Sequence, residues 1–179
     1  MRRFVIPLLV LALLGSSAGA QTPRPIDSLA WLVGGVWIAD ASKLGGGLQR
    51  IEVRYEWAPT KNFIRFATIF VSDQGPLVNY AGNIYSYGSG SSETLAMWYM
   101  DAKGAITQGN ISGPGDRWSL TFDSAAGGKT TTYRVDLVKK AANTYGWTVS
   151  SLDGAWKPLF SLDYIRSAHG LTATPLKNV

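Results

Sequence analysis

Apolar and polar residues alternate along most of the chain beyond its N-terminal part. Trp118, Leu120 and Phe122, for example, are interleaved with Ser119 and Thr121. A period of two residues places alternate side chains on opposite faces of a β-strand. Segments of this kind are separated by Gly, Pro, Asn and Asp, the residues that form tight turns. The strands expected from this pattern are 35–40, 48–57, 62–73, 77–87, 93–100, 106–111, 117–123, 130–137, 145–151 and 159–166.

Short loops join these segments, so strands that follow each other in the sequence are expected to pair antiparallel. About ten such strands without a long crossover close readily into an up-and-down barrel, which leaves no sheet edge exposed. The one helical signal lies at 27–32, where Asp27 is the expected N-cap and Leu29 and Leu32 point to one side. The sequence therefore predicts an all-β protein, a single antiparallel up-and-down β-barrel of about ten strands with a short N-terminal helix.

The N-terminal segment has the layout of a secretory signal peptide. Arg2 and Arg3 precede an apolar run, and the small residues Ala18-Gly19-Ala20 follow it. The run is too short to span a bilayer comfortably, and no later stretch approaches the ~20 apolar residues of a transmembrane helix. We therefore expect cleavage after Ala20 and export to the periplasm or the extracellular space, with no transmembrane segment remaining. The expected organisation is a signal peptide at 1–20, an extended leader at 21–26, the β-barrel at 27–168 and a C-terminal tail at 169–179.

Composition narrows the chemistry that such a barrel can support. The 179 residues include no Cys and a single His, which excludes disulfides, thiolate sites and His-rich metal sites. The aromatic content of 12%, with 7 Trp and 8 Tyr, suits a β domain better than a helical bundle. The net charge of +5 decreases by two when Arg2 and Arg3 are removed. An exported protein with so modest a charge is not expected to bind nucleic acid.

One pair of motifs resembles a known family. Gly35-Val36-Trp37 lies on the first expected strand, and Arg166 lies on the last one. This combination resembles the lipocalin-like (calycin) barrels, in which the Trp of a Gly-x-Trp motif packs beneath an Arg of the last strand. The domain is most similar to a group of uncharacterised secreted bacterial lipocalin-like proteins. The resemblance implies an internal apolar cavity for a small hydrophobic molecule, and a cation–π contact between Trp37 and Arg166 worth about 0.5–2 kcal/mol.

A more distant resemblance is to the nitrobindins, ten-stranded barrels that bind haem through a His near the C-terminus. The only His of this chain is His169, in the segment that follows the last expected strand. A solvated residue in the tail accounts for this His more simply than an iron ligand does. We therefore expect no cofactor and retain haem as an alternative.

Large side chains on the strands are the candidates for a cavity wall, because aromatic rings and Met give broad contact area and Tyr hydroxyls orient a ligand. Arg65 is the one basic residue set among apolar neighbours. Facing inward, it would bind a ligand carboxylate; facing outward, it would pair with Glu52 or Glu56. The expected ligand-binding residues are Tyr55, Arg65, Tyr85, Tyr87, Met97, Tyr99, Trp118, Tyr133 and Trp147.

These observations predict an exported binding protein for a small hydrophobic or anionic amphipathic ligand. Three alternatives remain: a haem-binding barrel, a structural or interaction barrel filled by its own side chains, and a small isomerase or cyclase. The sequence has no Gly-x-Ser-x-Gly nucleophile motif, and most of its carboxylates lie in turns or on the outward-facing positions of strands. No catalytic residue and no metal ligand is therefore assigned, and the oligomeric state stays open.

Overall fold

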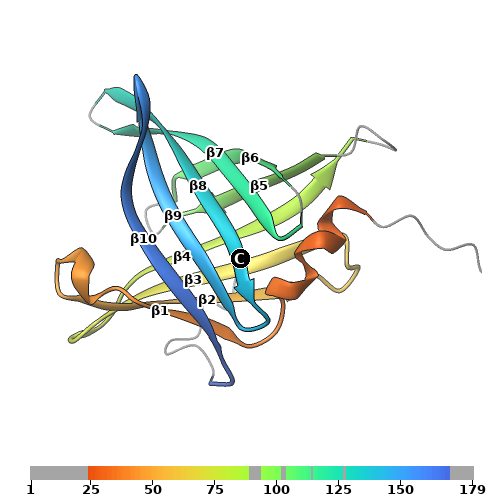
Figure 1. Ribbon diagram of the computed structural model, residues 1–179, viewed down its shortest axis with the longest axis horizontal. Coiled ribbons are helices and arrows are strands. Elements are labelled where there is room, and N and C mark those ends of the chain that lie inside the picture. The colour runs from red at the N-terminus through yellow and green to blue at the C-terminus, as the bar shows by residue number, and fades with distance from the viewer. Residues whose placement is uncertain (1–23, 89–93, 102–103, 114, 127, 170–179) are drawn as a thin grey trace, which may run out of the picture.

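The protein folds into a ten-stranded barrel with one helix at its N-terminal end (Figure 1). The computed structural model describes residues 24–88, 94–101, 104–113, 115–126 and 128–169. The predicted signal peptide, residues 21–23 of the predicted leader and residues 170–179 of the predicted tail lie outside the described residues. The last two residues of the predicted extended leader, Pro25 and Ile26, are helical instead. Two 3-10 helices are present, η1 (Pro25–Leu32) and η2 (Ser42–Leu44). The strands are β1 (Val36–Asp40), β2 (Leu48–Trp57), β3 (Phe63–Ser72), β4 (Gly75–Tyr87), β5 (Thr94–Met100), β6 (Ile106–Ser112), β7 (Arg117–Ala126), β8 (Lys129–Ala141), β9 (Thr144–Asp153) and β10 (Ala155–Ser167).

Every strand pairs antiparallel with its neighbour in the sequence, and β1 also pairs with β10, so that the sheet closes on itself. The predicted fold class, an all-β up-and-down barrel, is therefore confirmed. Closure joins the two ends of the fold directly, because Trp37 on β1 stands opposite Arg166 on β10. The inward positions carry the apolar side chains of the predicted alternation, for example Trp118 and Leu120, which are almost fully buried.

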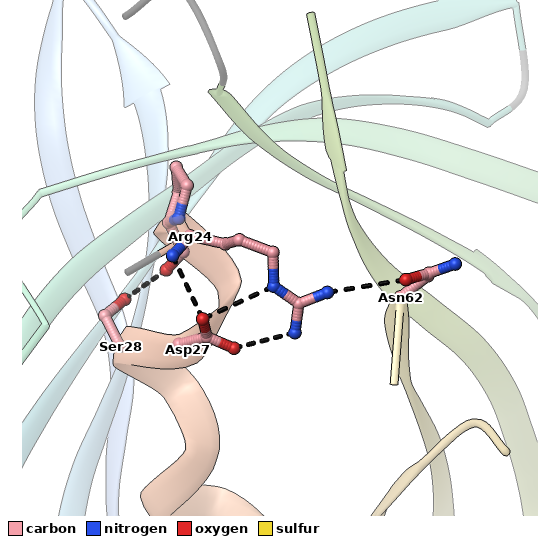
Figure 2. Close-up of polar contacts among 5 residues, drawn as sticks. Arg24, Asp27, Ser28 and Asn62 are labelled. Carbon is pink, nitrogen blue, oxygen red and sulfur yellow. Dashed lines mark hydrogen bonds and ion pairs between the residues drawn. The ribbon is translucent and has the colours of Figure 1, made fainter. Parts of the chain in front are cut away.

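The helix η1 begins earlier than the sequence pattern predicted. Arg24 is its N-cap, and Pro25 occupies the first helical position, where proline loses no hydrogen bond. Asp27, predicted as the N-cap, is instead the third residue of the helix (Figure 2). Its carboxylate accepts the backbone N–H of Arg24 at 3.0 Å and the Arg24 guanidinium at 2.8 Å. These bonds lower the pKa of Asp27 and fix the start of the helix.

The helix η1 covers one end of the barrel, called here the closed end. It contacts β4 and β5, and buries Ile26, Leu29 and Leu32 in the core. Trp31 projects from the same helix, and its indole N–H donates a hydrogen bond to the carbonyl of Gly115 at 3.1 Å. An apolar helix face and one long-range hydrogen bond thus attach η1 to the strand ends. Within the described part of the chain, no helix has the length and apolar character needed to cross a membrane.

Trp37 and Arg166 hold the closed end together, as the motif predicted. The guanidinium carbon of Arg166 lies 4.3 Å from the centroid of the Trp37 ring, which confirms the cation–π contact. The same guanidinium donates hydrogen bonds to the carbonyls of Val33 at 3.0 Å and Gly34 at 2.8 Å, and to the carbonyl of Trp31. Three carbonyls at the end of η1 are therefore tied to the last strand.

Gly35 is required by the closeness of this contact. Its φ of +72° lies in the left-handed region, and a Cβ there would stand 2.8 Å from the carbonyl oxygen of Ser167. The indole N–H of Trp37 donates to the carbonyl of Leu32 at 2.7 Å. The Gly-x-Trp motif thus supplies both the space and the ring for the Arg166 contact.

Candidate ligand-binding cavity

A cavity of about 260 Å³ lies inside the barrel. Inward-facing side chains of β2–β5 and β7–β10 form its wall, and most of the exposed wall surface is apolar. The wall changes along the barrel axis. Side chains near η1 are fully buried and form a floor, whereas those at the opposite end are half-buried and surround an opening, called here the mouth.

Three tyrosines, Tyr55, Tyr145 and Tyr164, are buried at the floor, with exposed fractions of at most 4%. The rings of Tyr145 and Tyr164 stack at 4.8 Å between centroids, and Tyr145 also packs edge-on against Trp37 at 4.8 Å. Burial raises the pKa of Tyr55 to about 12 and holds the pKa values of Tyr145 and Tyr164 well above the usual value of a tyrosine. All three hydroxyls are therefore neutral at physiological pH.

Two polar atoms of the cavity wall are buried without a hydrogen-bond partner. They are the hydroxyl oxygen of Tyr145 and the indole nitrogen Nε1 of Trp118. The Tyr55 hydroxyl is close enough to Tyr145 to moderate the rise in its own pKa, but the two do not meet hydrogen-bond geometry. Leaving a buried polar group unpaired costs about 1–3 kcal/mol, and such groups are rare in folded proteins.

The mouth is bordered by an arc of aromatic rings from β3, β4, β5, β7 and β8. Centroids of consecutive rings lie 5.4 Å apart for Phe70 and Tyr80, 5.9 Å for Tyr80 and Tyr99, and 6.1 Å for Tyr99 and Phe122. Tyr133 extends the arc by stacking on Phe122 at 5.7 Å. These rings make edge-on and stacked contacts that are worth about 0.5–1.5 kcal/mol each. The mouth therefore has a rim of half-buried aromatic side chains.

Charged side chains are missing from the described wall of the cavity: its lining contains no Asp, Glu, Lys, Arg or His. No group of three or more potential metal ligands occurs among the described residues either. A proton-transfer enzyme would need a titratable group near neutrality in this space, and the pKa values of Tyr55, Tyr145 and Tyr164 there are raised. Nothing in this wall gives specific support to the isomerase or cyclase alternative.

His169 lies outside the barrel. It is exposed, and it borders a separate surface depression near the closed end together with Val36 and Arg54. A haem inside the cavity would need an axial ligand there. The position of the chain's only His does not fit that requirement.

Five of the predicted ligand-binding residues line the cavity: Tyr55, Met97, Tyr99, Trp118 and Trp147. They come from four different strands, so the period-two pattern identified the inward face correctly in each of those strands. Tyr133 lies on the inward face of β8 at the rim, where it stacks on Phe122.

Tyr85 and Tyr87 were predicted in the cavity wall, and this prediction is wrong. The register of β4 turns Ile84 inward, because Ile84 stands opposite the inward-facing Met97 of β5. Residues next to Ile84 along the strand therefore face outward. The rings of Tyr85 and Tyr87 pack against each other at 6.3 Å on the outer face, and the hydroxyl of Tyr87 lies 3.2 Å from the Asn110 carboxamide oxygen.

Arg65 faces outward, which resolves the two orientations that the sequence left open and removes this residue from the predicted cavity wall. Its side chain is exposed, and in the sheet it stands opposite Glu56 of β2 and Asn83 of β4. Phe66, its neighbour in the sequence, lines the cavity instead. Arg65 had provided the only reason to expect an anionic ligand, and that reason no longer holds.

The sequence pattern missed several wall residues. Tyr145 lies on the same inward face of β9 as Trp147, and Tyr164 lies on the same inward face of β10 as Leu162. The alternation of these two strands could therefore have identified both tyrosines as wall residues. Gly82 could also have indicated which neighbouring rings face inward. A Cβ at this position would lie 2.6 Å from Cζ of Phe66 and 2.7 Å from Cβ of Tyr99. A glycine between two inward rings on adjacent strands leaves room for both rings.

The geometry thus defines a closed antiparallel ten-stranded barrel with an apolar internal cavity, an architecture compatible with a lipocalin-like fold. Comparison of the chain with protein-family models and with curated protein sequences gave no match.

Proposed function

We propose that the protein is an exported, lipocalin-like binding protein that holds one small hydrophobic molecule in its barrel. The observation that supports this most strongly is the cavity of about 260 Å³ with an apolar wall. A barrel that served only as a structural module would fill this space with side chains, since protein interiors are otherwise close-packed.

The size of the cavity limits the ligand. At about 30 Å³ per water molecule in the liquid, the space equals roughly nine waters. Typical sites for drug-sized ligands are about 300–1,000 Å³, so the ligand is compact, with one or two rings or a short chain. The aromatic and Met side chains of the wall provide dispersion contacts to such a molecule.

The charge of the wall limits the ligand further. A buried ion without a partner is costly, and the described wall offers no cation or anion to pair with one. The ligand is therefore uncharged. The N-terminal segment supports export, because Arg2-Arg3, the apolar run and Ala18-Gly19-Ala20 follow the order of a signal peptide.

Binding can be tested with naphthalene, an uncharged two-ring probe. We expect saturable one-to-one binding in the micromolar range by calorimetry. Val149→Trp places a large ring in the cavity wall and is expected to weaken binding about tenfold or more. Thr121→Trp adds the same ring at an exposed position on β7 and is the matched control, with unchanged binding expected.

Mass spectrometry of an organic extract of the protein from its own host would identify the natural ligand. The proposal is contradicted if naphthalene does not bind to the wild-type protein, or if Val149→Trp binds it as tightly as Thr121→Trp does. Circular dichroism of both variants establishes that each is folded before the comparison is made.

A further inference from the structure

The two unpaired polar atoms of the cavity wall carry information about the ligand. Trp118 and Tyr145 are 3% and 0% exposed, and neither the indole nitrogen nor the hydroxyl oxygen has a partner in hydrogen-bond geometry among the described residues. The Tyr55 hydroxyl interacts with that of Tyr145 without meeting this geometry. Both residues line the cavity. Both atoms lie just behind the cavity surface. An unpaired group in a cavity wall can be satisfied by an occupant once neighbouring side chains shift to admit it, so these atoms mark where the polar part of an occupant belongs.

Both atoms belong to the closed-end half of the cavity. Trp118 and Tyr145 each lie within the first two residues of their strands, β7 and β9. Trp31 of η1 packs on the Tyr145 ring at 5.9 Å, and its indole N–H is bonded to Gly115 just before β7. The helix that covers the barrel end thus holds both strand ends in place.

The surrounding rings restrict how Trp118 and Tyr145 can move. Trp118 packs edge-on against Trp147 at 6.3 Å, and Tyr145 is held between Trp37 at 4.8 Å and Tyr164 at 4.8 Å. Neither side chain can turn to a new partner without displacing buried rings. The two polar atoms are therefore positioned before any ligand binds, which reduces the entropy lost on binding.

The chemistry of the two groups selects the ligand atom. An indole N–H can only donate a hydrogen bond, and a Tyr hydroxyl can donate as well as accept. Burial keeps the Tyr145 hydroxyl protonated, so it is a donor across the physiological pH range. A single oxygen with two lone pairs can accept from both groups. An anion is disfavoured because no cation lines the described wall.

We propose, as an extension of the proposed function, that the cavity selects uncharged ligands that carry a hydrogen-bond acceptor, a carbonyl or an ether oxygen. The Trp118 N–H and the Tyr145 O–H bind this oxygen at the floor. The apolar remainder of the ligand lies against the rings toward the mouth, so that the molecule binds with a fixed orientation.

A matched pair of probes separates this selectivity from general apolar binding. Acetophenone and α-methylstyrene have the same shape, but the first carries a carbonyl oxygen where the second carries a methylene group. We expect the wild-type protein to bind acetophenone about fivefold or more tightly in calorimetric titrations, as one hydrogen bond to an otherwise unpaired donor would produce.

Three single substitutions assign the preference to specific atoms. Trp118→Phe removes the indole N–H, and Tyr145→Phe removes the hydroxyl with almost no change of shape. Trp98→Phe is the control, because it removes an indole from the outward face of β5, outside the cavity lining. We expect the ketone preference to shrink to about twofold or less in Trp118→Phe and Tyr145→Phe and to remain in Trp98→Phe.

The outcomes distinguish the two proposals. Equal binding of the two probes by the wild-type protein would overturn the selectivity and leave the proposed function intact. A preference that survives in both Trp118→Phe and Tyr145→Phe would also overturn it. Failure of both probes to bind would overturn the proposed function as well. Tyr145→Phe is expected to fold, because it removes an unpaired buried hydroxyl and leaves the packed ring.

Discussion

Different interactions hold the two ends of the barrel together. At the closed end, the Arg166 guanidinium and the indole nitrogens of Trp31 and Trp37 all bond to backbone carbonyls. At the mouth, Phe70, Tyr80, Tyr99 and the rings that follow contact mainly one another. Directional hydrogen bonds to the backbone hold the first end, whereas contacts between side-chain rings form the second. Under the proposed function, the ligand enters through the mouth.

The largest expected effect concerns the ring at the centre of the closed end. Trp37 is fully buried and contacts Trp31, Tyr145 and Arg166. Trp37→Ala is expected to lower the free energy of unfolding by about 3–5 kcal/mol, because it leaves a large cavity. Urea unfolding followed by circular dichroism measures this loss. A loss no larger than that of Phe122→Ala at the mouth would contradict the proposed difference between the ends.

The second largest effect is a loss of unfolding free energy at alkaline pH, caused by the buried tyrosines of the floor. The pKa of Tyr55 is raised from 10.0 to about 12 in the folded protein, so the unfolded chain loses this proton first as the pH rises. The contribution of Tyr55 is fully present below pH 10 and is lost between about pH 10 and 12. Two pKa units correspond to about 3 kcal/mol of unfolding free energy.

Tyrosinate absorbance measured together with circular dichroism tests this expectation. The buried tyrosines should ionise only when the protein unfolds, and Tyr55→Phe should weaken the pH dependence above pH 10. Ionisation of all tyrosines near pH 10 in a folded protein would show that the floor is open to water.

Arg166 provides the third test, because it joins η1 to the last strand. Arg166→Met keeps an apolar stem against Trp37 but removes the donors to Trp31, Val33 and Gly34. We expect a loss of about 2–3 kcal/mol, since hydrogen bonds from charged groups are worth about 1.5–3 kcal/mol. Arg166→Lys is expected to recover less than half of it, because an ammonium group lacks the planar fork of donors. Full recovery in the Lys variant would mean that charge alone stabilises the closed end.

The same difference explains why the closed end could be predicted from the sequence more fully than the cavity wall. The closed end was predictable from a local motif, Gly35-Val36-Trp37, and one distant Arg, because a positive φ and a specific ring leave a clear signature. The strands and their order were predictable from alternation and turn residues. The expected boundaries were three or four residues short on β7, β8 and β10, where residues without a regular polar–apolar alternation continue the pairing.

The wall was harder to predict because it depends on register. On β3 both faces are apolar, with Ile69 buried on the outward side and Ile64 on the inward side, so alternation could not orient Arg65. On β4 the aromatic residues Tyr85 and Tyr87 alternate in the way expected of an inward face. Only the pairing of Ile84 with Met97 shows that they face outward. Cross-strand register is set by the whole sheet and cannot be read from one strand.

The smallest effect on stability is expected at the mouth. Phe122→Leu keeps an apolar side chain and should cost less than about 1.5 kcal/mol. It interrupts the ring arc between Tyr99 and Tyr133, so naphthalene should leave the cavity faster. Stopped-flow displacement measures the off-rate, and urea unfolding measures the stability. A large loss of stability without a change of off-rate would assign Phe122 to the fold instead of the mouth.

The NMR signals of the methionine methyl groups test directly whether a ligand binds inside the barrel. Besides Met1 the chain contains only Met97 and Met100. Met97 lines the cavity, whereas Met100 stands opposite the exposed Ala81 on the outward face of the same strand. Titration of methyl-¹³C-methionine protein with naphthalene, followed by NMR, is predicted to shift the Met97 methyl signal saturably and to leave Met100 unchanged. An unshifted Met97 signal, or equal shifts of the two, would contradict binding in the cavity.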